Sequence, residues 1–340
     1  MHRVTIKDVA KHLNISVATV SLALRGDTRI AEKTRKSVRD TAKELGYTYN
    51  RQAANLRMGR SNTVAICIND LYNPIYNKVL IGVEERLNQE GWMLLLCNAR
   101  EDVKRQHQFL KKVREMNAAG VLLAPVPHTT SDDIKNTLGK MPIVLFNRSL
   151  PGEDFDSVIS NDVVGIKLVI DHLHFLGHRH IGWIGSNLSS STGQSRFEAF
   201  KVFMAAYGLS TEERMMAFIA NTRSEGYEAA RRILKASPET TALACFGDPM
   251  ALGALAFARD YERESGRKLS VTGYDDGDEA LFSAPRLTSV CQPKEKMGAM
   301  AADRLLEKIK PAAGEMDSNF HKQIVDPTLS IRESTFPVER

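Results

Sequence analysis

Apolar and polar positions alternate with the period of short helices through the first part of the chain. Apolar residues recur every three or four positions over residues 6–13, behind Thr5 as a possible N-cap, and again over 17–24, behind Ser16. A third amphipathic stretch covers residues 32–45 and stops before a glycine that can form a left-handed C-terminal cap. Two short helices joined by a tight turn, with a third to close the core, predict a helix-turn-helix domain over residues 1–46.

From residue 63 onward, short apolar runs alternate with helical periodicity. The strand-like runs are 63–68, 92–97, 120–124, 142–146 and 180–185, with further strands near Met216, Leu243 and Val271. The helical stretches are 79–88, 103–116, 134–138, 163–175 and 194–207. This alternation is typical of parallel sheets built from βαβ units, and it predicts two doubly wound lobes. Ligands of such sheets bind beyond the carboxyl ends of the strands, so two facing lobes predict a cleft.

Residues 47–61 separate these two parts. Asn50 can cap a helix that reaches Arg57, a length of eight residues. Isolated helices shorter than about 12 to 15 residues are marginal in water, so this helix should depend on a partner. The alternative interpretation is a plain interdomain linker.

The basic charge is concentrated at the N-terminal end. Residues 1–60 hold 13 Lys and Arg against 5 Asp and Glu, a net charge of +8, whereas the whole chain carries +5, which leaves −3 for the rest. A cationic headpiece suits a protein that neutralises DNA phosphates and releases their counterions. Each basic side chain alone could be an ordinary solvated helix face, but the set as a whole favours nucleic-acid binding.

Length and composition favour a cytoplasmic protein with more than one globular unit. The chain has 340 residues, of which 43% are hydrophobic. We expect neither a signal peptide nor a membrane-spanning segment in it. Its four cysteines lie far apart in apolar runs, without the spacing of zinc or redox sites, and are expected to be buried, reduced thiols.

Several segments follow the pattern of one known family, in order along the chain: 5–10, 17–21, 34–35, 44–47 and 50–56 in the headpiece and hinge, and 175–181, 273–276 and 286–290 in the body. Through these segments the chain resembles the LacI/GalR family of bacterial transcription regulators. Leu22 and residues 50–53 also resemble the maltose-system repressors within that family. The resemblance implies an α/β fold, with an N-terminal helix-turn-helix headpiece and a two-lobed, doubly wound core like that of periplasmic binding proteins.

The resemblance also implies the domain boundaries. Residues 1–46 form the DNA-binding domain, 47–61 the hinge with its helix, and 62–340 an effector-binding and dimerisation core. Within the core, the N-lobe takes about residues 62–157 and 291–322, and the C-lobe about 158–290 and 323–340. The expected partners are double-stranded operator DNA, a second copy of the chain in a homodimer, and a small-molecule effector of the carbohydrate class; no membrane is expected.

The DNA contacts are implied residue by residue. The positions that match base contacts are Val17, Ala18, Leu22, Ala53 and Leu56, and those that match phosphate contacts are Thr5, Ser16, Thr19, Ser21, Arg25, Arg29, Thr34, Tyr47 and Asn50. The three readers in the second helix are all apolar, so they cannot bond guanine edges and should contact thymine methyl groups. Leu56 would be the wedge that opens a base step in the minor groove. Ala31 stands where a capping side chain is common, at a cost of about 1 kcal/mol to the third helix.

The effector contacts are implied in the same way. The matching positions are Asn73, Tyr76, Asn147, Arg148, Arg196, Asn221, Asp248 and Asp275. Carboxylates and guanidinium groups suit vicinal hydroxyls or anionic groups because they form paired hydrogen bonds. One departure is Gly247, where many relatives carry asparagine, so one sugar-type contact is expected to be missing. Each of these residues could instead belong to a surface ion pair.

Other chemistry finds little support. His172, His174, His178 and His180 do not have the spacing of a metal site, and the serines near residue 190 lack a placed base. Residues 182–185 lack the full spacing of a phosphate cradle. No catalytic residue, metal or cofactor is therefore expected. The competing class is a sugar-binding protein of a transport system, which the basic headpiece disfavours.

Overall fold

The computed structural model describes residues 4–48, 61–152, 154–310 and 320–338. The chain divides into two compact units, Met1–Ser61 and Asn62–Arg340. The first is helical and the second holds two sheets of six strands each. The predicted fold class is confirmed: a helix-turn-helix headpiece and a two-lobed α/β core.

The headpiece consists of three helices at the predicted positions. They are α1 (Ile6–Leu13), α2 (Val17–Leu24) and α3 (Glu32–Glu44). Their core is small and made of branched or short side chains, namely Val9, Ala10, Val20, Ala23, Val38 and Ala42. Gly46 follows α3 with a φ of 71°, the left-handed conformation expected for the residue after a helix.

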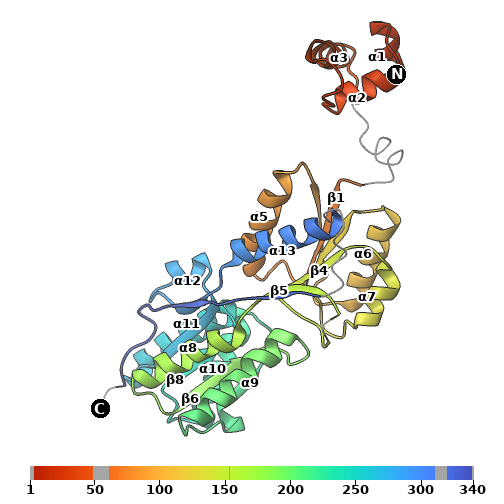
Figure 1. Cartoon of the computed structure of the whole chain (residues 1–340). Coiled ribbons are helices and arrows are strands. Elements are labelled where there is room, and N and C mark those ends of the chain that lie inside the picture. The colour runs from red at the N-terminus through yellow and green to blue at the C-terminus, as the bar shows by residue number, and fades with distance from the viewer. Residues whose placement is uncertain (1–3, 49–60, 153, 311–319, 339–340) are drawn as a thin grey trace. The chain divides into compact units, whose positions relative to one another are not determined.

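The first lobe of the core is a parallel sheet covered on both faces (Figure 1). Its strands are β1 (Thr63–Ile68), β2 (Met93–Asn98), β3 (Gly120–Leu123), β4 (Ile143–Phe146), β5 (Asp156–Ser160) and β11 (Lys322–Val325), in the order β11-β5-β4-β3-β1-β2. Helices α5 (Ile75–Asn88) and α13 (Lys294–Ile309) pack on one face, and α6 (Val103–Glu115) and α7 (Ser131–Leu138) on the other. Burial on both faces explains the nearly continuous apolar strands.

Helices α5 and α13 pack with their backbones in direct contact. A Cβ atom on Gly82 would lie 2.0 Å from the carbonyl oxygen of Glu295, and one on Gly298 would lie 2.2 Å from the carbonyl oxygen of Val79. Any larger side chain at either glycine would force the helices apart.

The second lobe repeats this architecture. Its strands are β6 (Ile181–Gly185), β7 (Met216–Phe218), β8 (Ala242–Cys245), β9 (Ser270–Asp275), β10 (Thr288–Cys291) and β12 (Thr328–Ser330), in the order β12-β10-β9-β8-β6-β7. Its helices are α8 (Asp162–Phe175), α9 (Ser191–Ala206), α10 (Arg223–Ala236), α11 (Asp248–Ser265) and α12 (Asp278–Phe282). Every strand pair is parallel except β10 with β12.

The chain crosses between the lobes three times: from β5 to α8, from β10 to α13 and from β11 to β12. Because β5 and β11 both belong to the first sheet, the lobe boundaries predicted at residues 157 and 322 each come a few residues too early. The pattern of apolar residues does not predict strand β5, because this strand is polar. Its Asp156 is fully buried and forms ion pairs with Arg304, at 3.0 Å, and with Lys308.

Three helices of the core begin about one turn earlier than their apolar periodicity indicates. Helix α5 begins at Ile75 rather than residue 79, α7 at Ser131 rather than 134, and α9 at Ser191 rather than 194. In α7 and α9 the extra turn is capped. The hydroxyl of Thr130 accepts a hydrogen bond from the amide of Asp133 at 3.1 Å, and that of Ser190 accepts one from the amide of Gly193 at 3.1 Å.

Candidate functional site

Helix α2 presents an uncharged outer face. Its N-cap, Ser16, accepts a hydrogen bond from the amide of Thr19 at 3.0 Å, which fixes the start of the helix. Ala18 is exposed and Leu22 half-buried, four residues apart on the outer side, whereas the expected base reader Val17 also packs against the headpiece core. The outer face of α2 therefore offers methyl groups and hydroxyls rather than charges.

The other headpiece residues implied by the resemblance differ in exposure. Thr5, Ser16, Arg25 and Arg29 are exposed, whereas Thr19, Ser21, Thr34 and Tyr47 are half-buried. Asn50, Ala53 and Leu56 lie outside the described residues. Ala31 precedes α3 and provides no side-chain cap, as expected.

The basic side chains of the headpiece differ in whether a carboxylate pairs with them. Arg29 donates two hydrogen bonds to Asp27, Nε to Oδ1 at 3.0 Å and Nη2 to Oδ2 at 2.7 Å, and this holds the pKa of Asp27 well below its usual range. Five lysines have no ion pair within the described parts of the chain: Lys7, Lys11, Lys33, Lys36 and Lys43. These lysines can bind phosphates directly, whereas Arg29 must first exchange its carboxylate for a phosphate.

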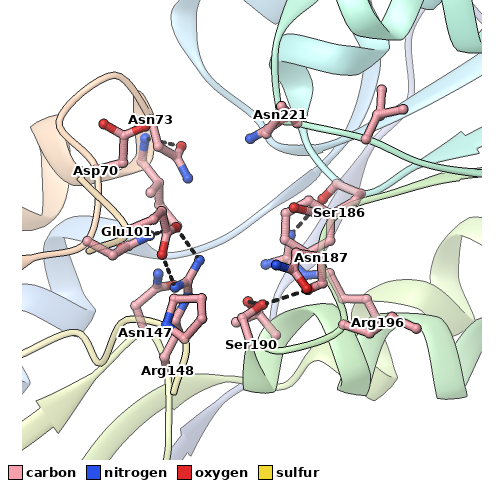
Figure 2. A pocket seen from close by; sticks show the side chains of 18 of the residues that line it. Asp70, Asn73, Glu101, Asn147, Arg148, Ser186, Asn187, Ser190, Arg196 and Asn221 are labelled. Carbon is pink, nitrogen blue, oxygen red and sulfur yellow. Dashed lines mark hydrogen bonds and ion pairs between the residues drawn. The ribbon is translucent and has the colours of Figure 1, made fainter. Parts of the chain in front are cut away.

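A cavity of about 920 Å³ opens between the two lobes of the core. Its walls are the loops that follow strands β1 to β4 in the first lobe and β6 to β9 in the second, so it lies at the carboxyl ends of both sheets, as the topology predicts. Figure 2 shows Asn73, Glu101 and Arg148 on one wall, across from Ser186, Asn187 and Asn221 on the other.

Six of the eight expected effector residues line this cavity: Asn73, Asn147, Arg148, Arg196, Asn221 and Asp275. The other two lie behind its walls. Tyr76 is fully buried and receives a hydrogen bond from Asn147 Nδ2 at 2.9 Å. Asp248 accepts hydrogen bonds from Ser289 Oγ at 2.6 Å and from the amide of Gly277 at 2.8 Å. Neither side chain lines the cavity, and Tyr76 supports the lining residue Asn147.

The wall of the first lobe is held by a chain of buried polar contacts. Arg148 donates Nη1 to Glu101 Oε2 and Nη2 to Glu101 Oε1, each at 2.8 Å, and Asn69 donates to the same carboxylate at 2.5 Å. Tyr76 donates its hydroxyl to Asn69 and so extends the chain to Asn147. Burial raises the pKa of Tyr76, so its hydroxyl stays protonated. The loops after β1, β2 and β4 are thereby fixed to one another.

Backbone strain is concentrated around the cavity. Of the eight non-glycine residues with positive φ in the described parts, six lie in loops that line or adjoin it: Arg100, Glu101, His128, Asn147, Asp275 and Asp276. Such conformations cost roughly 1 to 3 kcal/mol each and persist where the surroundings hold them. Their clustering marks these loops as the functional region of the core.

In the second lobe, Arg196 is almost fully buried and already has a carboxylate partner. Its Nε donates to Asp162 Oδ1 at 2.8 Å, its Nη1 donates to the carbonyl oxygen of Phe246 at 2.7 Å, and its guanidinium lies 3.5 Å from the ring centroid of Tyr274. Burial alone would lower the pKa of Arg196, but Asp162 and Tyr274 outweigh it, so the charge is retained. Among the described residues Nη2 has no hydrogen-bond partner, which leaves this group for a ligand.

Two carboxyl groups of the second lobe titrate unusually. Burial raises the pKa of Asp275 to about 6, although Arg196 and Lys294 oppose the shift. Burial and the neighbouring charge of Asp275 raise the pKa of Asp248 to about 7. Asp275 also accepts a hydrogen bond from Gln292 Nε2 at 2.7 Å. Of the two, only Asp275 lines the cavity, and a raised pKa of a lining carboxyl group is typical of functional sites.

Several lining residues were missed from the sequence. They are Asn69, Asp70, Glu101, His128, Ser186, Asn187, Ser190 and Thr192. Each follows the carboxyl end of a strand or begins the helix after it, and that position was the available signal.

The glycine at position 247, where the family resemblance implies an asparagine, makes room for a neighbouring side chain. A Cβ atom at Gly247 would lie 3.0 Å from Asn221 Nδ2.

The histidines near residue 175 have structural partners. His178 lies between Thr241 Oγ1, at 2.9 Å from Nδ1, and the carbonyl oxygen of Phe336, at 3.1 Å from Nε2, and burial lowers its pKa to about 4. His172 bonds Thr335, and His174 stacks on Tyr207. Across the described ranges, no three His, Cys, Asp or Glu residues group as a metal site would require. No helix there is long and apolar enough to span a membrane.

Comparison with known sequences assigns both units. Residues 5–50 match the bacterial regulatory proteins of the lacI family, and residues 170–335 match a periplasmic binding protein-like domain. The chain is 30% identical over 311 residues to the HTH-type transcriptional repressor PurR of Serratia proteamaculans, which covers 90% of both proteins. It is 27% identical over 335 residues to the ribose operon repressor of Haemophilus influenzae, covering 98% of this chain and 99% of that protein.

Solved structures agree in fold. The Lac repressor dimer bound to operator and an anti-inducer aligns with a TM-score of 0.85 at 22% identity, over 98% of this chain and all of that one. The complex of the transcriptional regulator CelR with cellobiose aligns with a TM-score of 0.73 at 27% identity, over the same shares. The chain therefore belongs to the lacI family of bacterial regulatory proteins.

Proposed function

We propose that this transcriptional regulator represses genes by binding a roughly palindromic operator as a homodimer, and that a small polar molecule in the interlobe cavity sets its affinity for DNA. The observation that carries the proposal is the cavity itself, whose polar walls come from both lobes and whose loops hold most of the strained backbone. A ligand that bonds to both walls changes the relative stability of lobe arrangements. Residues 1–46 act as the DNA-binding unit, 47–61 as the hinge and 62–340 as the effector-binding and dimerisation core.

The charges in the cavity favour a neutral polyhydroxylated effector. Arg148 is paired with Glu101 and Arg196 with Asp162, so neither guanidinium contributes an unbalanced positive charge. Asp275 and the asparagines of both walls can accept and donate hydrogen bonds to hydroxyl groups. A sugar satisfies such groups, whereas a phosphorylated ligand would bring negative charge that no unpaired cation among the described lining residues offsets. CelR, which binds cellobiose, is consistent with this class.

On DNA, the outer face of α2 reads the major groove. Val17, Ala18 and Leu22 contact thymine methyl groups, while the hydroxyls and basic side chains around α2 and α3 bind phosphates and set the register. One headpiece is too small for high specificity, and a symmetric dimer reads two half-sites. The expected hinge helix, Asn50 to Arg57, lies outside the described residues; through the family resemblance we include in the proposal that Ala53 and Leu56 contact the minor groove.

A regulator that binds chromosomal DNA acts in the cytoplasm. We assign it no enzymatic activity, since the relatives named above are transcriptional repressors.

The test is DNA selection with the full-length chain. Gel shifts with fragments of the source genome at moderate salt should retain one or a few sequences, each with two similar half-sites. Leu22→Asp, which places a negative charge on the outer face of α2, should abolish this selection while leaving thermal unfolding of the core unchanged. Binding without sequence preference would refute the proposal and favour the alternative, a sugar-binding protein of a transport system.

A further inference from the structure

Two cysteines that are 30 residues apart in the sequence become neighbours in the sheet of the first lobe. Strands β1 and β2 pair in parallel with Cys67 in register with Cys97. Both thiols are free, and both lie on the face of the sheet that α6 covers. Adjacent strands are about 4.7 to 4.9 Å apart, within the range of Cα separations found for disulfides. The pair is therefore close enough to be joined by a small movement.

The two thiols have different environments. Cys67 is fully buried, whereas Cys97 is half-buried on β2, which pairs only with β1 in the sheet order and so forms its edge. A hydrogen bond from the Cys67 thiol lowers the pKa of Cys97; burial opposes this, and the nearby cations of Arg105 and Lys112 on α6 lower the pKa further. Reactive cysteines are accessible, have a stabilised thiolate and lie beside a second thiol.

The other two cysteines lack these features. Cys245 is buried, and Cys291, though half-buried like Cys97, has its pKa raised by burial and by Asp276. Cys291 thus provides a matched control of similar exposure.

We propose that Cys67 and Cys97 form a peroxide-responsive thiol pair whose oxidation alters the effector cavity; the second part rests on the proposed function. The Cys97 thiolate attacks a hydroperoxide, the O–O bond breaks, and Cys97 becomes a sulfenic acid as the peroxide is reduced to an alcohol or water. Cys67 then attacks the sulfenic sulfur. The S–S bond forms as the sulfur–oxygen bond breaks, and the proton of Cys67 leaves with the hydroxide as water.

The pair lies directly beneath the cavity wall. Beyond Cys67 the chain leaves β1 after Ile68 and reaches Asn69, and beyond Cys97 it leaves β2 after Asn98 and reaches Glu101 in the following loop. The two loops are joined by backbone hydrogen bonds, from the amide of Ala99 to the carbonyl oxygen of Ile68 at 2.9 Å and from that of Glu101 to Asn69 at 2.8 Å. A disulfide needs Cβ atoms about 3.5 to 4.5 Å apart, closer than the strand spacing, so the bond draws the edge strand β2 towards β1. Glu101, the partner of Arg148, moves with it.

The chemical step is tested on the reduced full-length protein with stoichiometric hydrogen peroxide, followed by alkylation, non-reducing digestion and mass spectrometry. We expect a peptide linked through Cys67 and Cys97 and loss of alkylation at Cys97, whereas Cys291 stays reduced. Cys67→Ala should stop at a sulfenic acid on Cys97 that dimedone traps. Cys97→Ser should abolish oxidation, and Cys291→Ser should change nothing. Equal alkylation rates of Cys97 and Cys291, or oxidation of Cys97 without a linked peptide in the wild type, would overturn the thiol pair.

Hydrogen exchange tests the effect on the cavity without any effector. In the oxidised protein, the exchange rates of the Ala99 and Glu101 amides should change by about tenfold or more, whereas the Phe246 amide in the second lobe should not change. Unchanged exchange in a protein that carries the linked peptide would refute the effect on the cavity. Both measurements stand even if the operator or effector proposals fail.

Discussion

Arg148 donates two parallel hydrogen bonds to Glu101, each 2.8 Å long, across the loops that follow β4 and β2. The guanidinium is buried, and its Nε atom has no hydrogen-bond partner among the residues that the structure describes. The ion pair therefore does two things: it neutralises a buried cation and it fixes one wall of the cavity.

We expect Glu101→Ala to destabilise the core by roughly 1 to 3 kcal/mol, because it leaves the Arg148 cation buried without a counterion. This loss of stability is smaller than the loss expected for a fully buried ion pair, because the Glu101 side chain is 38% exposed. Chemical denaturation followed by circular dichroism measures the change. Glu84→Ala, an exposed glutamate of α5 without an ion pair in the described chain, is the control, and an equal effect of both variants would contradict the prediction.

Asn73→Ala and Asn187→Ala should each weaken the response to the effector by about tenfold, because a lost hydrogen bond to a ligand costs about 1 to 1.5 kcal/mol. Operator binding without effector should stay as in the wild type, since within the described parts of the chain each asparagine side chain bonds only to a backbone amide two residues further on. Fluorescence anisotropy with operator DNA, after a thermal-shift screen of sugars, measures both.

Asn136→Ala, on the exposed side of α7, is the control. Arg196→Ala is a poor substitute because it would leave Asp162 buried without its partner. If both cavity variants respond to the effector as the wild type does, the effector binds elsewhere.

Asp27→Asn should strengthen DNA binding. The substitution removes the carboxylate that holds the Arg29 guanidinium, so Arg29 becomes available for a phosphate. The slope of log affinity against log salt should steepen by about 0.9, the value for one added phosphate contact. Asp40→Asn makes the same charge change on α3 without releasing an arginine, and it should leave the slope almost unchanged.

Replacing operator thymines by deoxyuridine should reduce affinity where α2 contacts the base. Burial of a methyl group contributes about 0.8 kcal/mol, so each contacted thymine should cost about fourfold in affinity. The same replacement outside the half-sites is the control. In Leu22→Ala, the loss of affinity caused by replacing the thymine that Leu22 contacts should be smaller. Half-sites that keep their affinity after every such replacement would exclude recognition of thymine methyl groups by α2.

The pKa of Asp248 is raised to about 7 and that of Asp275 to about 6. Ionisation of these two carboxyl groups therefore lowers the stability of the folded protein as pH rises. Between their ordinary value of 3.8 and about 7, the folded state binds more protons than the unfolded state, so their contribution to stability is present at low pH and is lost as pH approaches 7. Asp248→Asn cannot ionise. The difference in Tm between this variant and the wild type should therefore shift in favour of the variant by a few degrees from pH 5 to pH 8, and a constant difference would disprove the assignment.

The sequence predicted those parts of the fold that have a strong local period. All three headpiece helices and most strands of the core follow from apolar spacing, because one face or both faces of each are buried. Strand β5 does not, since its buried Asp156 depends on Arg304 and Lys308, about 150 residues further along the chain. No local pattern reveals such a pairing.

The cavity residues likewise divide into those that the sequence predicts and those that depend on distant partners. The resemblance to a family identified Arg148, but not its partner Glu101, which is 47 residues away and lies in a loop of positive φ. Likewise, Cys67 and Cys97 become neighbours only through the register of β1 and β2. Pairings of this kind are decided by topology.

The three crossings between the lobes determine the order in which the chain can fold on the ribosome. The headpiece is contiguous and can fold once its residues have left the exit tunnel. The first lobe obtains β11 only near residue 325, and the second obtains β12 only near residue 330, so neither sheet is complete until nearly the whole chain has been made. A nascent chain would thus carry a finished DNA-binding unit long before it has a core that can respond to a ligand.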